Sequence, residues 1–130
     1  MSSRPVPDPD AAGAPFWASC ARHELTVQTC SSCGSRRHPP RPMCPRCRSF
    51  SSSFEPASGR GTVWSWVVAH QPVLAAFAED VPYTVAVVEL EEGVRMIGRL
   101  FANEVHPGMA VTVDWEDVSD GVALACWRPA

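Results

Sequence analysis

The 130-residue sequence contains no lysine, so its 11 basic residues are all arginines. It also lacks an apolar run long enough to cross a membrane, and we expect no membrane-spanning segment. Its start shows no secretory-signal pattern, which favours a reducing, cytoplasmic location. A Ser-His-Asp order, a glycine-rich phosphate loop and a pair of inward carboxylates are all missing, and these absences argue against an independent enzyme.

The net charge of −3 hides an asymmetry along the chain. Residues 1–48 contain seven arginines and three acidic residues, a net charge of +4, whereas residues 49–130 contain four arginines and eleven acidic residues, a net charge of −7. A compact basic module is therefore joined to an acidic one. The acidic module would repel a nucleic-acid backbone, so nucleic-acid binding is the weaker of two functional hypotheses.

Four of the six cysteines form two Cys-x-x-Cys pairs, ten residues apart, at Cys30, Cys33, Cys44 and Cys47. Two such knuckles facing each other make a tetrahedral thiolate site, which selects zinc or, less often, iron. Two disulfides are the alternative, but a reducing compartment disfavours them, and a thioredoxin-like site needs a single pair on a βαβ unit. Four protein ligands leave no open position, so we expect a structural metal.

The patterns predict a mainly β protein with an N-terminal helix and a rubredoxin-like zinc ribbon followed by a five-stranded OB-fold barrel. We expect a disordered leader over 1–14, the helix and ribbon over 15–53, and the barrel over 54–130. Alternating apolar residues predict the barrel strands at 61–70, 83–90, 94–101, 110–116 and 122–128. In the fourth of these strands, Trp115 should be buried, with Asp114 and Glu116 exposed.

Three apolar segments are candidates for contact surfaces. A short helix from about Pro15 to Glu24 would present Phe16, Trp17 and Cys20 on one face, to dock on its own ribbon or on a partner. In the first barrel strand, strict alternation would place Val63, Val67 and Ala69 on one face and Trp64, Trp66 and Val68 on the other. The loop over 71–82 is too apolar to lie free in water, so it folds over the barrel mouth or meets another molecule.

An ordered series of motifs over residues 15–130 resembles a family of zinc-ribbon plus OB-fold proteins long called a domain of unknown function. The resemblance lies in a set of short motifs: Phe16-Trp17, Cys30-x-x-Cys33-Gly34, Pro39-Pro40-Arg41-Pro42, Cys44-Pro45-x-Cys47, Gly59-x-Gly61-Thr62-Val63, Val68-x-His70, the loop with Phe77, Val81-Pro82-Tyr83, Val87-x-x-Leu90 and Gly108-Met109.

The resemblance implies a partner. Members of this family pair with thiolases, thiolase-like aldolases or hydratases that act on CoA thioesters, in some bacteria during degradation of steroid side chains. An archaeal member bridges two enzymes and helps form a shared CoA site. Some relatives are fused to a hydratase domain, whereas we expect this chain to act as a separate subunit in a hetero-oligomer. Zinc would be its structural cofactor and acyl-CoA a shared ligand.

The resemblance, the missing catalytic set and the apolar helix and loop together suggest candidate sites. We expect His70, Phe77 and Tyr83 to line an acyl or pantetheine channel, although a strand-end histidine bonded to backbone is the ordinary alternative for His70. Arg36, Arg37 and Arg41 are candidates for CoA phosphates, or they form a collar around the zinc thiolates. The expected partner interface comprises Phe16, Trp17, Trp64, Trp66, Val73 and Leu74.

Overall fold

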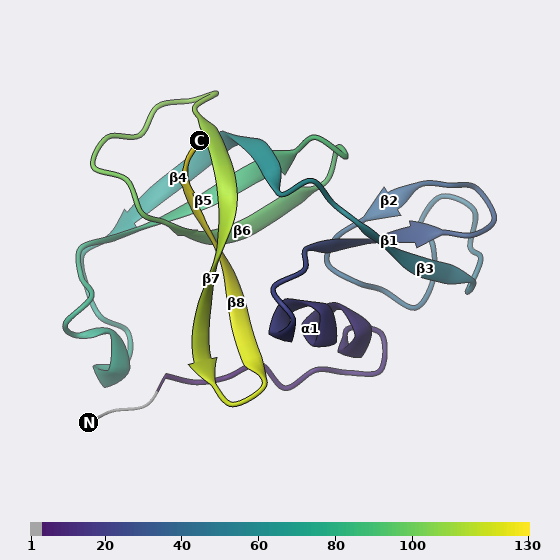
Figure 1. Cartoon of the computed structure of the whole chain (residues 1–130), viewed down its shortest axis with the longest axis horizontal. Helices are drawn as coiled ribbons and strands as arrows, with labels where there is room; N and C mark the ends of the chain where they lie inside the picture. The colour runs from purple at the N-terminus through teal and green to yellow at the C-terminus, as the bar shows by residue number, and fades with distance from the viewer. Residues whose placement is uncertain (1–3) are drawn as a thin grey trace.

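The computed structural model describes residues 4–130, and it confirms the expected mainly β architecture (Figure 1). Helix α1 is followed by a three-stranded ribbon sheet and a closed five-stranded barrel. No helix in this part of the chain has the length and apolarity needed to cross a membrane. The elements are α1 (Ala14–Ala21), β1 (Thr26–Cys30), β2 (Arg36–Arg37), β3 (Ser52–Pro56), β4 (Arg60–Ala69), the 3-10 helix η1 (Ala75–Phe77), β5 (Tyr83–Leu90), β6 (Arg95–Leu100), β7 (Ala110–Ser119) and β8 (Val122–Pro129).

The barrel has the strand order β4-β5-β6-β8-β7 and closes by pairing of β4 with β7. All of its neighbours are antiparallel except β6 and β8, which are parallel and meet at Leu100 and Trp127. This is the order of an OB-fold, whose second and third strands and first connecting loop form its usual binding face. Here that face comprises β5, β6 and the loop that carries η1.

Trp127 occupies the centre of the barrel and is fully buried. A Cβ atom at Gly98 would lie 2.7 Å from the indole Nε1, so only glycine lets the ring pack against β6. Trp115, which we expected to be buried, is only half-buried, and its ring stacks on exposed His23 with centroids 5.6 Å apart. Asp114 is half-buried as well, because it pairs with Arg128.

The predicted faces of β4 are wrong beyond Val63. The register with β5 shifts between Val63 and Ser65, which marks a β-bulge at Trp64. A bulge inserts one residue and reverses the alternation that follows it. Val63 and Trp66 therefore both pack toward the core, whereas Trp64 and Val67 are 53% and 64% exposed.

Helix α1 ends three residues earlier than expected and packs on β8 and β1. Phe16 and Cys20 are 6% and 0% exposed and belong to the same core as the barrel. Phe16 is therefore an internal contact, and the expectation that it anchors a partner is wrong. The third ribbon strand runs to Pro56, past the expected boundary at residue 53.

The expected disordered leader covers residues 1–14, of which the first three lie outside the described residues. Residues 4–13 contain neither helix nor strand. Nevertheless, the Arg4 guanidinium lies 3.0 Å from an Asp80 oxygen and 3.1 Å from a Glu116 oxygen. Glu116, expected to be exposed, is half-buried in this contact. The segment thus lies across one end of the barrel, next to η1 (Figure 1).

Candidate functional site

The four predicted metal ligands converge at one end of the ribbon. The sulfur atoms of Cys30, Cys33, Cys44 and Cys47 all lie within 4.8 Å of one another. The Cys30–Cys47 and Cys33–Cys44 sulfur pairs are 3.5 and 3.7 Å apart. A tetrahedral zinc site with bonds of about 2.3 Å requires sulfur separations of about 3.8 Å, so these two pairs already have nearly the spacing of a zinc site. Because all four ligands come from the protein, the metal would hold the fold together and leave no position for substrate.

Hydrogen-bond donors stabilise the thiolate form of two of the four cysteines, Cys30 and Cys44. The Cys33 backbone N–H lies 3.5 Å from the Cys30 sulfur and is the main cause of the lowered pKa of Cys30. The Ser35 hydroxyl lies 3.3 Å from the Cys44 sulfur and lowers the pKa of Cys44 to about 5, with backbone N–H groups adding to the effect. Thiolates that are stable at neutral pH are the form that binds zinc.

The segment between the two knuckles is tied to β1 by the side chain of Gln28. Its amide nitrogen donates to the Arg41 carbonyl at 2.8 Å, and its amide oxygen accepts from the Arg41 N–H at 2.8 Å. Arg37 also donates to the Arg41 carbonyl, at 2.9 Å. A buried glutamine satisfied in this way fixes the loop that carries the second knuckle.

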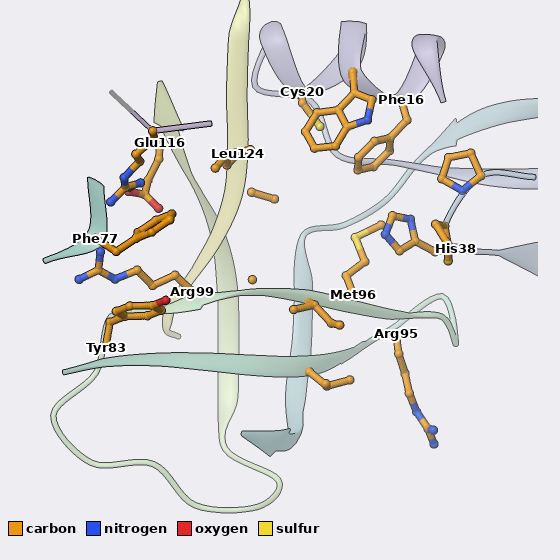
Figure 2. Close-up of a pocket in the computed structure, with 18 residues that line it drawn as sticks. Phe16, Cys20, His38, Phe77, Tyr83, Arg95, Met96, Arg99, Glu116 and Leu124 are labelled. Atoms are coloured by element: carbon orange, nitrogen blue, oxygen red, sulfur yellow. Dashed lines mark hydrogen bonds and ion pairs between the residues drawn. The ribbon is translucent and has the colours of Figure 1, made fainter. Parts of the chain in front are cut away.

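An apolar groove of about 640 Å³ lies beside the ribbon (Figure 2). Its walls come from α1, from the 38–40 segment, and from β5, β6 and β8, with η1 at one end. Trp17 lines this groove next to Phe16 and Cys20. The groove thus crosses β5 and β6, the strands that form the usual ligand face of an OB-fold.

Aromatic and charged side chains form the η1 end of the groove (Figure 2). Phe77 packs on Tyr83 with ring centroids 6.0 Å apart. The guanidinium of Arg99 lies 5.5 Å from the Tyr83 ring, and that of Arg4 lies 5.5 Å from the Phe77 ring. This end therefore combines two aromatic faces with cations that can meet the polar part of a ligand.

His38 lines the opposite end, where its ring lies 5.1 Å from that of Phe16. Burial lowers the pKa of His38 to about 4, so the imidazole is neutral at physiological pH. A neutral, half-buried ring is compatible with the apolar lining and adds no charge to it.

The pKa of His38 predicts a specific loss of stability in acid. The unfolded imidazole binds a proton near pH 6.5 and the folded one only near pH 4, so acidification across this window favours the unfolded state. We expect the melting temperature of the wild type to fall more between pH 7.5 and about pH 5 than that of His38→Gln. His106→Gln, which changes an exposed histidine, is the control and should follow the wild type. The zinc content of all three proteins is measured at each pH, and identical falls in melting temperature at equal zinc content would contradict the prediction.

The groove contains some of the residues expected to form a channel and excludes others. Phe77 and Tyr83 line it. His70 does not: it is exposed just past the end of β4, where Ala69 pairs with Tyr83, and its place in a channel stays a prediction. Val73 and Leu74 point into solvent, at 88% and 47% exposure.

Sequence reasoning missed the β6 residues of the groove. Arg95, Ile97 and Arg99 alternate with the buried positions of this strand and share its outer face. That alternation is visible in the sequence and could have identified the face. His38 gave no such signal, because it reaches the groove only through tertiary packing.

The three arginines expected at CoA phosphates lie in a second cavity, of about 400 Å³, where the ribbon meets the barrel. Arg36 donates to the Glu92 carbonyl at 3.5 Å, and Arg37 donates to the Arg41 carbonyl. Among the described residues, these side-chain hydrogen bonds go to backbone oxygens and none goes to a thiolate. The interpretation of these arginines as donors to the zinc site therefore finds no support in the hydrogen bonds.

Together, the fold and the thiolate site define a structural zinc ribbon joined to a closed OB-fold barrel. Two family models match the chain: "ChsH2, rubredoxin-like zinc ribbon domain" over residues 17–53 and "ChsH2, C-terminal OB-fold domain" over residues 54–116. A "DUF35 domain-containing scaffold protein" of Methanocaldococcus jannaschii is 36% identical over 78% of this chain and 77% of its own length. The chain therefore belongs to the DUF35 family of zinc-ribbon and OB-fold proteins.

Other relatives are larger or of known structure. The "3-oxo-4,17-pregnadiene-20-carboxyl-CoA hydratase alpha subunit" of Mycobacterium tuberculosis is 40% identical over 94% of this chain. The chain spans 42% of that protein, and 37% of a similar "Probable enoyl-CoA hydratase alpha subunit" from Thermomonospora curvata. A chain from the structure of an "Ltp2-ChsH2(DUF35) aldolase" superposes with a TM-score of 0.87 at 36% identity, covering 95% of this chain and 98% of that one.

Proposed function

We propose that this chain is a non-catalytic accessory subunit of a cytoplasmic enzyme that acts on acyl-CoA thioesters. The observation that carries the proposal is the nearly full-length similarity to a chain of an aldolase complex. The similarity to two proteins named as CoA hydratase alpha subunits supports a link to CoA-thioester chemistry. The partner would be a thiolase-like aldolase, a thiolase or a hydratase, and the M. tuberculosis relative favours a lipid or steroid substrate.

The groove itself supports a non-catalytic role. Burial raises the pKa of Cys20 to about 11, so this thiol is a poor nucleophile at neutral pH. Glu116 is engaged by Arg4, and His38 lies at the other end of the groove (Figure 2). The groove thus offers no nucleophile held by a base, and the partner's residues would perform the chemistry.

The groove is suited to positioning instead. Trp17 and Tyr83 offer aromatic surface to an acyl or pantetheine chain, and Phe77 closes one end. Apolar lining with a few polar groups at the ends is typical of a ligand site. The subunit would hold the substrate and exclude water while the partner reacts with the thioester.

Exposed apolar residues beside the groove form the proposed docking surface for the partner enzyme. Ile97 is 71% exposed on the outer face of β5–β6, and Val67 is exposed on the same face of β4. Val73 and Leu74 add two more exposed apolar side chains in the loop between β4 and β5. Large exposed apolar areas of this kind mark interaction sites, and central anchors carry most of the binding energy.

Replacing both loop residues should weaken the complex without harming the fold. The double variant Val73→Ser/Leu74→Ser removes two exposed side chains that belong to no described core contact. We expect affinity for the partner enzyme to fall by about 2 kcal/mol, or roughly 30-fold, measured by titration calorimetry of separately purified proteins. Phe50→Ser, at a 75% exposed position on the ribbon, is the matched control. Equal affinities for both variants and the wild type would exclude the loop from the interface.

A further inference from the structure

The segment over residues 4–13 is a strap that is fixed at one end to helix α1. Asp10 accepts the Gly13 N–H with its carboxylate at 2.7 Å and the Ala14 N–H with its carbonyl oxygen at 3.0 Å, which holds the strap at the start of the helix. From there the strap passes the β7–β8 hairpin and reaches η1 (Figure 1). Every second residue over 5–9 is a proline, and proline-rich segments are stiff and extended. Little chain entropy is therefore lost when the far end of the strap binds.

Arg4, at the far end of the strap, binds two elements at once. Its guanidinium lies 3.0 Å from an Asp80 oxygen and 3.1 Å from a Glu116 oxygen, so it joins the loop over 71–82, which carries η1, to β7. The same guanidinium lies 5.5 Å from the centre of the Phe77 ring. The three charged side chains are between 24% and 29% exposed, and partly buried ion pairs are screened by salt less than exposed ones.

The loop over 71–82 has few other attachments to the barrel. The backbone hydrogen bonds that the structure describes within it all end on carbonyls of the loop itself, and η1 contains no buried residue. Besides Arg4, the side chains that hold the loop are Phe77, which packs on Tyr83, and Asp80, which lies 3.8 Å from Arg99. A segment with so few buried contacts opens readily, so the Arg4 contacts are a large part of what keeps it closed.

The strap and the loop meet at one end of the apolar groove. Arg4, Phe77 and Glu116 all line the groove there, so the ion pairs hold an aromatic wall in place (Figure 2). We propose that residues 4–13 form a strap whose Arg4 latches Phe77 over this end of the groove, and that release of Arg4 opens the end to apolar ligands. This gate is a property of the single chain and goes beyond the proposed function.

Chymotrypsin cleavage of the zinc-loaded full chain after Phe77, located by mass spectrometry, measures how often the loop opens. The protease must take the Phe77 ring into its own pocket, which the closed loop prevents. We expect Arg4→Gln to raise the cleavage rate at this bond about fivefold, because the ion pairs are lost. Cleavage after Phe50, which is 75% exposed on the ribbon, is the internal control and should not change. Arg22→Gln breaks an exposed ion pair with Glu24 away from the groove, so it should behave as the wild type.

Two further measurements separate a latch made of ion pairs from a merely structural role of Arg4. Arg4→Lys keeps the charge but not the fork of donors, so its cleavage rate at Phe77 should lie between those of the wild type and Arg4→Gln. Added salt should raise the rate for the wild type more than for Arg4→Gln, with each rate taken relative to cleavage after Phe50.

Entry of N-phenyl-1-naphthylamine, an uncharged fluorescent probe, tests the gate in stopped-flow measurements. The probe should enter Arg4→Gln faster than the wild type or Arg22→Gln. Equal cleavage at Phe77 in the wild type and Arg4→Gln would overturn the latch. Faster cleavage with equal rates of probe entry, or no probe binding by any of the three proteins, would overturn the gate. No partner enzyme is present in these measurements, so their outcome is independent of the proposed function.

Discussion

Replacement of Cys44 by serine is expected to abolish zinc binding and to unfold the loops of the ribbon. Cys44 is fully buried among the four thiolates, and the segment over 31–51 is otherwise held only by the two-residue strand β2 and a few hydrogen bonds such as those of Gln28. Zinc binding at such sites is worth on the order of 10 kcal/mol of folding free energy. The loss of structure should not extend into β1, because β1 remains paired with β3. Its Val27 also belongs to the core that the ribbon shares with the barrel.

Elemental analysis and amide hydrogen exchange measure this effect. The wild type should contain one zinc per chain, and Cys44→Ser should contain none and lose protection over 31–51 while the barrel amides stay protected. Cys126→Ser, at a buried cysteine of β8 outside the zinc site, is the control and should retain its zinc. A wild type without metal, or a Cys44→Ser protein with full zinc and unchanged protection, would contradict the assignment.

Replacement of Trp127 by alanine is expected to be the most damaging change in the barrel. Its side chain is fully buried and packs where Gly98 leaves room for it. Removing a buried aromatic ring leaves a cavity and costs about 3–5 kcal/mol. Trp64→Ala should cost under about 1 kcal/mol, because Trp64 is 53% exposed and its main partner is the guanidinium of Arg95, 3.8 Å from the ring.

Equilibrium unfolding in urea, followed by far-UV circular dichroism, separates these two cases. The barrel transition of Trp127→Ala should shift to lower urea with little change in slope, and Trp64→Ala should overlay the wild type. A loss below about 1 kcal/mol for Trp127→Ala would mean that the packing at Gly98 is misassigned.

The ribbon and the barrel were both predictable from the sequence, because their signals are local. Two Cys-x-x-Cys pairs specify a thiolate site by spacing alone, and period-two alternation marks the strands. The alternation was misleading at Trp64, because a bulge adds one residue without a sequence signal strong enough to reveal it. Trp115 and Trp127 both point inward by register, but only Trp127 lies beside a glycine that admits its ring.

The groove was not predictable, because it is assembled by tertiary contacts between distant segments. Phe16, His38 and Tyr83 lie more than twenty residues from one another in sequence, and no periodicity relates them. Phe16 and Trp17 have the same apolar character, yet the packing of α1 on β8 buries the first and leaves the second on the groove wall. Arg36 and Arg37 are likewise adjacent residues of one type, and the pairing of β2 with β1 leaves Arg36 exposed and Arg37 buried.

The most direct test of the accessory role is a thioester assay with a thiolase-like aldolase, thiolase or hydratase from the same genome. The enzyme is purified without this chain, with the wild-type chain, and with the Val73→Ser/Leu74→Ser variant. We predict that the wild-type chain co-elutes with the enzyme in gel filtration and raises its activity on an acyl-CoA substrate, whereas the variant does so only at much higher concentration. An enzyme that is equally soluble and active alone, and that never co-elutes with this chain, would contradict the proposed function.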